Sequence, residues 1–364
     1  MRNITKLVLL IIILLLIIVA SCSLKPMKNL QIKEPDQAQE ADSDLIVVGF
    51  SQLGSESEWR TANTKSIQNA LSRENGFSLI YMNGRQKQEN QIKDIRSFIF
   101  QEVDYIVIAP VTETGWDTVL EEARDAGIPV IIVDRMIDTK DDSLYVASVG
   151  TDKYEEGRKA GRWLEEFLAK KEREKKASKE DRVSSDSPTS EEEVELEPED
   201  VNIVVLEGTL NSSAQIGRTN GFNEIAKQHP NWHILAHEDG DFTKAKGKEI
   251  MTKFLQEYDN IDVLVSQNDD MTFGAIEAIR EAGRTCGVNG EITVISFDAV
   301  NKAFDMMEAG FINVDIECNP LQGPDVAKII EALEKGEQVE KIVYVEEKVF
   351  EAQNAGKDRI GRSY

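Results

Sequence analysis

The chain has 364 residues, of which 41% are hydrophobic; this is enough for two packed domains and excludes a chain that is disordered throughout. Its net charge of −24 argues against nucleic acid as a partner, because phosphate binding needs an excess of Lys and Arg. Three cysteines in a chain of this length exclude a disulfide scaffold.

The first 22 residues have the layout of a lipoprotein signal peptide. Arg2 and Lys6 precede an apolar run over 7–20, about 14 residues long, which is shorter than the roughly 20 needed to cross a bilayer. The run ends in Val-Ala-Ser-Cys, which resembles the lipobox in which Cys22 receives a diacylglycerol; the alternative is an uncleaved anchor. We therefore expect an extracytoplasmic protein, lipid-anchored to the cell membrane or periplasmic, with residues 23–44 as a flexible linker.

The next segment, up to residue 150, alternates apolar strand-like runs with amphipathic helical patterns. The predicted strands cover 45–50, 77–82, 104–110, 128–134 and 144–150, and the predicted helices lie near 57–75, 87–102 and 114–126. Strands this apolar, separated by helices, are typical of βαβ units in a doubly wound parallel sheet.

A polar stretch then interrupts the alternation. It follows a helix predicted over 155–171, and residues 172–200 are rich in charge, Ser and Pro and nearly lack large apolar side chains. Such a composition cannot bury a core, so we predict a disordered charged insertion. A tolerated surface loop is favoured over a partner-binding segment.

After the insertion the same pattern starts again. The predicted strands cover 201–208, 232–238, 261–267 and 291–298, and the predicted helices lie near 213–228, 243–257, 269–282 and 300–309. Both halves open with a strand, a loop rich in hydroxyl groups and a helix that carries an Arg. The sequence therefore predicts an α/β protein with two copies of one architecture facing each other.

Polar side chains follow the predicted strands, where ligands of open parallel sheets bind. The candidates are Glu56, Ser57, Glu58, Trp59, Arg60, Asp134, Arg135, Arg218, Asn268, Asp298 and Glu317, the last after a strand-like run at 312–316. Carboxylates accept and Arg and Asn donate hydrogen bonds, and an indole stacks on sugar C–H groups, so the set suits a polyhydroxylated ligand. Each residue alone is more simply a polar surface residue; only their joint placement indicates a site.

Other kinds of site find little support. His229, His233 and His237 are spaced by four, but on the strand predicted there two such residues lie about 13 Å apart, so we expect no metal. The sequence has no phosphate-binding glycine loop, and we expect no cofactor. Cys286 and Cys318 could pair or stay free.

Several long blocks resemble one family. VGFSQLGSESEWRTA, DYIVIAPVTETGWDTVLEEARDAGIPVIIVDR and QNDDMTFGAIEAIREAG look like periplasmic sugar-binding proteins of the ribose/galactose class, the type I periplasmic-binding fold, and particularly like galactofuranose-binding components of sugar ABC transporters. The resemblance covers residues 45–364 apart from the insertion.

This resemblance implies two doubly wound lobes, 45–150 plus 319–345 and 151–318 plus 346–364, joined by a three-strand hinge. They would close on a galactose-type monosaccharide, with galactofuranose among the candidates, and dock on an ABC transporter permease. It implies a monomeric binding protein without enzymatic activity. Residues 56–60 would cradle the sugar, Asp134 and Arg135 would hold its hydroxyls from the first lobe, and Arg218, Asn268 and Asp298 from the second.

Two rival functions stay open at this point. The same fold can present a sugar to a membrane histidine kinase or chemoreceptor, which the sequence does not separate from transport. The acidic pair Asp269 and Asp270 could in principle serve an exported glycosidase, but no carboxyl in an apolar pocket is indicated.

Overall fold

The computed structural model describes residues 45–183 and 199–364. The predicted signal peptide, Cys22 and the linker lie outside these residues, as does the 184–198 part of the predicted insertion. Within the described ranges, no helix combines the length and the apolar character needed to cross a membrane.

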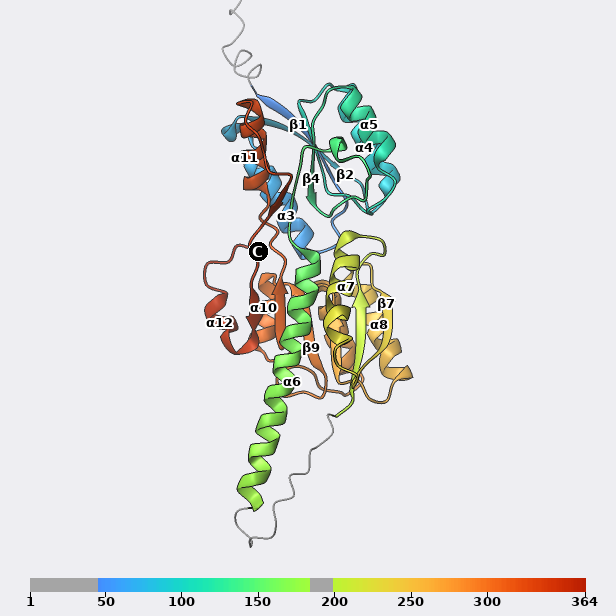
Figure 1. Ribbon diagram of the computed structural model, residues 1–364, viewed down its shortest axis with the longest axis vertical. Coiled ribbons are helices and arrows are strands. Elements are labelled where there is room, and N and C mark those ends of the chain that lie inside the picture. The colour runs from blue at the N-terminus through green and yellow to red at the C-terminus, as the bar shows by residue number, and fades with distance from the viewer. Residues whose placement is uncertain (1–44, 184–198) are drawn as a thin grey trace, which may run out of the picture. The chain divides into compact units, whose positions relative to one another are not determined.

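The first lobe is built on a six-stranded parallel sheet (Figure 1). Its strand order is β11 (Ile342–Tyr344), β5 (Ala147–Gly150), β4 (Val130–Asp134), β3 (Tyr105–Ile108), β1 (Ile46–Gln52) and β2 (Phe77–Asn83). Helices α3 (Glu58–Ala70) and α11 (Gly323–Glu334) cover one face, and α4 (Gln88–Phe100) and α5 (Asp117–Asp125) cover the other. The sheet is therefore buried on both faces, which explains its continuous apolar strands.

The second lobe repeats this plan. Its sheet has the order β12 (Val349–Glu351), β10 (Val314–Glu317), β9 (Thr293–Asp298), β8 (Val263–Ser266), β6 (Val201–Glu207) and β7 (Trp232–Asp239), and only β12 is antiparallel. Helices α6 (Lys153–Val183) and α7 (Ser213–Ala226) cover one face; α8 (Lys244–Glu257), α9 (Asp269–Glu281) and α10 (Asn301–Glu308) cover the other, and the short α12 (Ala355–Asp358) lies beside α10. Short 3₁₀ turns lie at 73–75, 142–144 and 352–354.

The chain passes between the two sheets three times. The passages join β5 to α6, β10 to α11, and β11 to β12. The predicted fold class, two doubly wound parallel-sheet lobes, is confirmed. Helix α11 and the three-residue strands β11 and β12 were not predicted.

Helix α6 corrects one boundary. The sequence predicted that disorder begins at residue 172, but α6, the long green helix of Figure 1, continues to Val183. The reason is helix propensity: residues 172–183 read EREKKASKEDRV, and Glu, Lys, Arg and Ala are strong helix formers even where they bury nothing. A charged composition therefore excluded a core there, but not a helix.

Helix caps place polar residues at the carboxyl ends of the strands. Ser57 caps α3 by accepting a hydrogen bond from the Arg60 N–H, and Asn268 caps α9 by accepting one from the Met271 N–H. Each cap stabilises its helix start by about 1 kcal/mol and fixes where the following side chains point.

Helices α6 and α7 approach so closely that only glycine fits between them. A Cβ on Gly221 would lie 2.0 Å from the Tyr154 carbonyl oxygen, and one on Gly157 would lie 2.3 Å from the Arg218 carbonyl oxygen. This contact matters for the site, because α6 begins with Lys153 and Glu156 and α7 carries Arg218.

Substitution Gly221→Ala is expected to lower the free energy of unfolding by about 1–3 kcal/mol, because the new methyl group meets backbone rather than a flexible side chain. Urea unfolding measures this. Gly356→Ala in α12 is the matched control: its nearest neighbour would be Glu308 Oε1 at 3.5 Å, an ordinary contact. There we expect a change within about 1 kcal/mol, in the stabilising direction. Equal stability of the two variants would contradict the tight contact.

Candidate ligand-binding site

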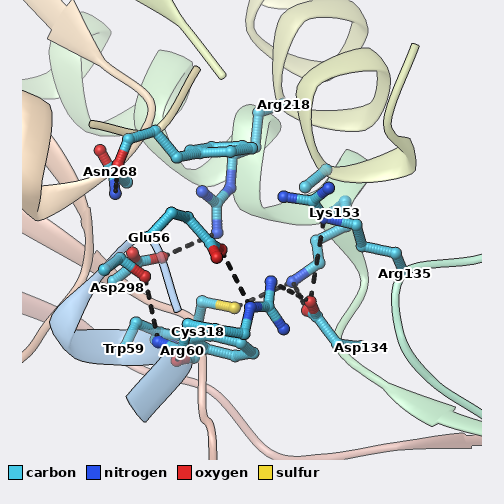
Figure 2. Close-up of a pocket in the computed structure, with 13 residues that line it drawn as sticks. Glu56, Trp59, Arg60, Asp134, Arg135, Lys153, Arg218, Asn268, Asp298 and Cys318 are labelled. Carbon is cyan, nitrogen blue, oxygen red and sulfur yellow. Dashed lines mark hydrogen bonds and ion pairs between the residues drawn. The ribbon is translucent and has the colours of Figure 1, made fainter. Parts of the chain in front are cut away.

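A pocket lies where loops from both sheets meet (Figure 2). It is lined by residues that follow β1, β4, β8, β9 and β10, together with residues of α6 and α7 and the loop after β7: Glu56, Ser57, Trp59, Arg60, Asp134, Arg135, Lys153, Ala214, Arg218, Phe242, Asn268, Asp298 and Cys318. Four of these side chains are cationic and three are carboxylates, and all seven are buried or nearly so. The pocket is therefore a dense set of charges shielded from water.

Asp134 is the centre of the charge cluster on the first lobe. Its Oδ2 lies 2.7 Å from Arg60 Nη2, and its Oδ1 lies 3.2 Å from Lys153 Nζ. Burial alone would raise the pKa of Asp134, but the charges of Arg60, Lys153 and Arg135 hold it below its ordinary value. Asp134 is therefore ionised, and it fixes two cations at the pocket wall.

Arg218 is the centre of the charge cluster in the second lobe. Its Nε donates to Glu156 at 2.6 Å, its Nη2 lies 3.1 Å from Asp298 Oδ1, and its Nη1 donates to the Gln267 carbonyl oxygen. Every nitrogen of this guanidinium is engaged within the protein, and the group is buried. Arg218 thus ties α7 to α6 and β9.

Arg135 is held differently. Its Nη1 donates to the Val111 carbonyl oxygen at 2.9 Å, but its Nε has no hydrogen-bond partner among the described residues. Burial, followed by the neighbouring charge of Arg60, lowers the pKa of Arg135 to about 10. The fold therefore keeps a cation in a place that disfavours its charge, as functional sites commonly do.

Two further buried polar atoms in the pocket have no partner among the described residues. They are Arg60 Nη1, a donor, and Glu56 Oε2, an acceptor. Leaving such atoms unpaired costs about 1–3 kcal/mol each, so most folded proteins avoid it. With Arg135 Nε, the pocket offers two donors and one acceptor to a polar ligand.

The free space between these groups is small. It amounts to about 20 Å³, room for about one water molecule. Two hydrogen bonds donated by backbone N–H groups hold the lobes together around it. The Met136 N–H donates to the side-chain Oγ of Ser213 at 2.8 Å, and the Glu113 N–H donates to the Asn211 carbonyl oxygen at 3.0 Å. A larger ligand enters only if the lobes separate.

Trp59 lines the pocket but is anchored elsewhere. The residue is 3% exposed, its indole N–H donates to the Cys318 carbonyl, and the ring packs in the core of the second lobe although α3 belongs to the first. Arg60 stands over the ring, 4.6 Å from its centroid. The indole thus supports a cation as well as bordering the pocket.

Nine of the eleven predicted site residues line this pocket, and two do not. Glu58 begins α3; its backbone N–H donates to Asp270, and its half-exposed side chain faces Lys302 at 3.8 Å. Glu317 accepts hydrogen bonds from Arg362 and Tyr364, each at 2.7 Å, so it anchors the C-terminal residues. These two placements correct the predicted set.

Four lining residues were not predicted: Lys153, Ala214, Phe242 and Cys318. Lys153 and Cys318 lie on two of the passages between the sheets, and Lys153 Nζ donates to Cys318 Sγ at 2.9 Å. The sequence prediction selected polar residues at the ends of strands. Lys153 instead begins a helix, and Cys318 follows a strand but is not strongly polar, so neither residue was selected.

One cluster among the described residues could offer ligands to a metal ion. Glu156, Cys318 and Glu347 bring ligand atoms within 4.8 Å of one another, but Lys153 Nζ stands 3.5 Å from Glu156 and opposes a cation there. Each histidine faces a different carboxylate: His229 faces Glu165, His233 faces Asp200, and His237 faces Glu207. Cys286 and Cys318 are both buried and free rather than paired.

A comparison with protein families matches residues 48–338 to the periplasmic binding protein domain. The chain belongs to the periplasmic binding protein family. This membership implies an extracytoplasmic location, and it confirms the resemblance found in the sequence.

Relatives of this periplasmic binding protein include galactofuranose-binding protein YtfQ of Escherichia coli strain K12, 40% identical over 80% of this chain and 81% of that protein. A solved structure from Mycobacterium smegmatis in complex with β-D-fucofuranose is 39% identical, with a TM-score of 0.74, and covers 86% of this chain and 93% of its own. The binding component of an arabinose transporter from Shewanella sp. ANA-3, bound to L-arabinofuranose, is 38% identical, with a TM-score of 0.74, and covers 86% and 94%.

Replacing Arg218 by Met in this periplasmic binding protein is expected to lower the free energy of unfolding by about 3–5 kcal/mol, because the buried Asp298 then loses the cation it pairs with and Glu156 keeps only the cation of Lys153, at 3.5 Å. Chemical denaturation measures the loss. Arg96→Met is the matched control: this arginine pairs with Glu122 at 2.7 Å but is half-exposed, so we expect less than about 1 kcal/mol. Similar losses in both variants would show that burial does not set the strength of these pairs.

Proposed function

We propose that this protein binds a monosaccharide between its lobes and delivers it to the permease of an ABC importer. The observation that carries the proposal is that three residues lining one pocket each have a buried polar atom without a hydrogen-bond partner among the described residues: Arg60 Nη1, Arg135 Nε and Glu56 Oε2. A sugar hydroxyl both donates and accepts, so one small polyol can satisfy donors and acceptors at once. The protein acts by binding, without catalysis.

The sugar we propose is galactose-type in its five-membered ring form. The relatives described above are a galactofuranose-binding protein and proteins solved with β-D-fucofuranose or L-arabinofuranose. The residues proposed to contact the ring and its hydroxyls are Glu56, Ser57, Trp59, Arg60, Asp134, Arg135, Arg218, Asn268 and Asp298. The arrangement of charges around the pocket suits a ligand rich in hydroxyl groups more than an apolar one.

Binding then requires a hinge motion. The lobes, 45–150 plus 319–345 and 151–318 plus 346–364, would rotate about the three passages, admit the sugar and close again. A ligand that contacts both lobes shifts the equilibrium toward the closed state by its differential affinity for that state. The lipid on Cys22 would keep the protein near its permease.

Isothermal titration calorimetry with D-galactose, D-fucose and L-arabinose tests the proposal. We expect at least one dissociation constant near or below about 1 μM, which corresponds to about −8 kcal/mol. Methyl β-D-galactopyranoside, locked in the six-membered ring, is the matched control and is expected not to bind. Binding of the locked sugar as tight as that of galactose would refute the ring form, and no binding of any sugar would refute the ligand class.

Arg135→Met is expected to weaken sugar binding by about 10- to 100-fold, because a charged donor to the ligand is lost. Stability without sugar should stay the same or rise, since the pKa of Arg135, lowered to about 10, shows that the unliganded pocket disfavours its charge. Calorimetry and urea unfolding measure the two effects. A loss of stability as large as that of Arg218→Met would contradict this role.

A further inference from the structure

A strained turn presents Asp298 to the pocket. Asp298 and Ala299 have φ values of 105° and 56°, in the left-handed region that favours glycine, yet neither residue is glycine. Such backbone costs about 1–3 kcal/mol per residue and persists only where its surroundings hold it. Something must therefore hold this turn in place.

Two buried carboxyl groups behind the turn supply that support. Asp315 Oδ1 accepts the Ala299 N–H at 3.0 Å, and Asp269 Oδ2 accepts the Val300 N–H at 2.9 Å. Ser296 donates to Asp269 Oδ1 at 2.6 Å. Both acids are fully buried, so each holds a backbone N–H in a place that water does not reach.

The two carboxyl groups also contact each other. Asp269 and Asp315 are hydrogen-bonded side chain to side chain, which requires a proton on one of them. Burial, and then the carboxyl of Asp315, raise the pKa of Asp269 well above its ordinary value, and burial raises the pKa of Asp315 to about 7. Asp315 therefore loses its proton near pH 7, whereas Asp269 keeps its own, so the pair shares one proton above that pH.

We propose that Asp269 and Asp315 are positioning residues for the ligand site: by accepting two backbone N–H groups, they hold the turn that aims Asp298 at the sugar. The proposal rests on the proposed function, since it concerns affinity for the same ligand. Neither residue lines the pocket, so they act through Asp298.

The charges around the pair decide how the turn responds to pH. Asp298 adds a third carboxyl, and Arg362, which donates to the Ala299 carbonyl at 2.8 Å, is the cation that faces Asp315. Of these three acids, Arg218 pairs only with Asp298. Loss of the Asp315 proton near pH 7 leaves one carboxylate beside the protonated Asp269, and an ionised carboxylate is the stronger acceptor for the Ala299 N–H, so the turn stays held as pH rises.

The equivalent turn of the first lobe lacks this device. Asp134 ends β4, the counterpart of β9 in strand order, and has φ 64°. Its side chain is held directly by Arg60 and Lys153. Among the described residues, the second lobe therefore holds its turn with a carboxyl pair, and the first lobe holds its own with cations.

The test measures D-galactose affinity by calorimetry for the wild-type protein, Asp315→Asn and Asp315→Ala at about pH 6 and about pH 8.5. Asn keeps the acceptor for Ala299 and donates permanently to Asp269, so we expect wild-type affinity at the lower pH. Wild type and Asp315→Asn should both stay within about twofold of that affinity at the higher pH, because both keep the acceptor for the Ala299 N–H. Asp315→Ala should bind at least tenfold more weakly at both.

Asp305→Asn is the control, because Asp305 is an exposed acid of α10 in the same lobe; it should reproduce the wild-type affinities. An Asp315→Asn protein that binds as weakly as Asp315→Ala, or an Asp315→Ala protein that binds as wild type does, would overturn the proposal. If the wild-type protein bound no sugar, the proposed function would fail instead.

A readout without sugar tests the pair itself. A carboxyl whose folded pKa is raised stabilises the fold below its unfolded pKa, about 3.9, and this contribution is lost as pH rises through the folded value, about 7 for Asp315. The stability of the wild-type protein should therefore decline more steeply over this window than that of Asp315→Asn. Identical slopes would show that Asp315 does not release a proton in this window.

Discussion

Pairing of charges in a pocket with room for about one water molecule is the constraint on which the rest of this structure depends. Arg60, Lys153 and Arg218 are each matched by a carboxylate within about hydrogen-bonding distance, and removing a buried ion from water costs several kcal/mol unless such a match is made. These ion pairs keep their hydrogen-bonding distances only if the backbone positions are fixed to within a few tenths of an ångström. The helix caps at Ser57 and Asn268 and the glycine contact between α6 and α7 provide that precision.

Duplication of one architecture explains where the acids lie, but not how each is held. Asp134 and Asp298 end corresponding strands, and both have left-handed backbone. In the first lobe cations bind the carboxylate directly, whereas in the second a carboxyl pair supports the turn from behind. The two lobes therefore present similar groups to a ligand while responding differently to their surroundings.

The sequence predicted the two-lobed fold and most of the pocket because both follow from local rules. Buried parallel strands are continuously apolar, and polar residues at their carboxyl ends gather at one edge, which is how Asp134, Asn268 and Asp298 were found. Lys153 and Cys318 were missed because their place depends on how the passages between the sheets run. Glu317 was misplaced because neighbouring residues after a strand point to different sides, and the pocket receives Cys318 instead. Strands β11 and β12 have three residues each, too few for any periodicity.

The burial of Trp59 makes the separation of the two lobes depend on temperature. Its indole is carried by the first lobe but buried in the apolar interior of the second, so any separation of the lobes brings that ring into water. Exposing apolar surface raises heat capacity, and the attraction that opposes it weakens on cooling. Opening should therefore become easier in the cold, and sugar uptake should carry a negative heat-capacity change even though most residues lining the pocket are polar or charged.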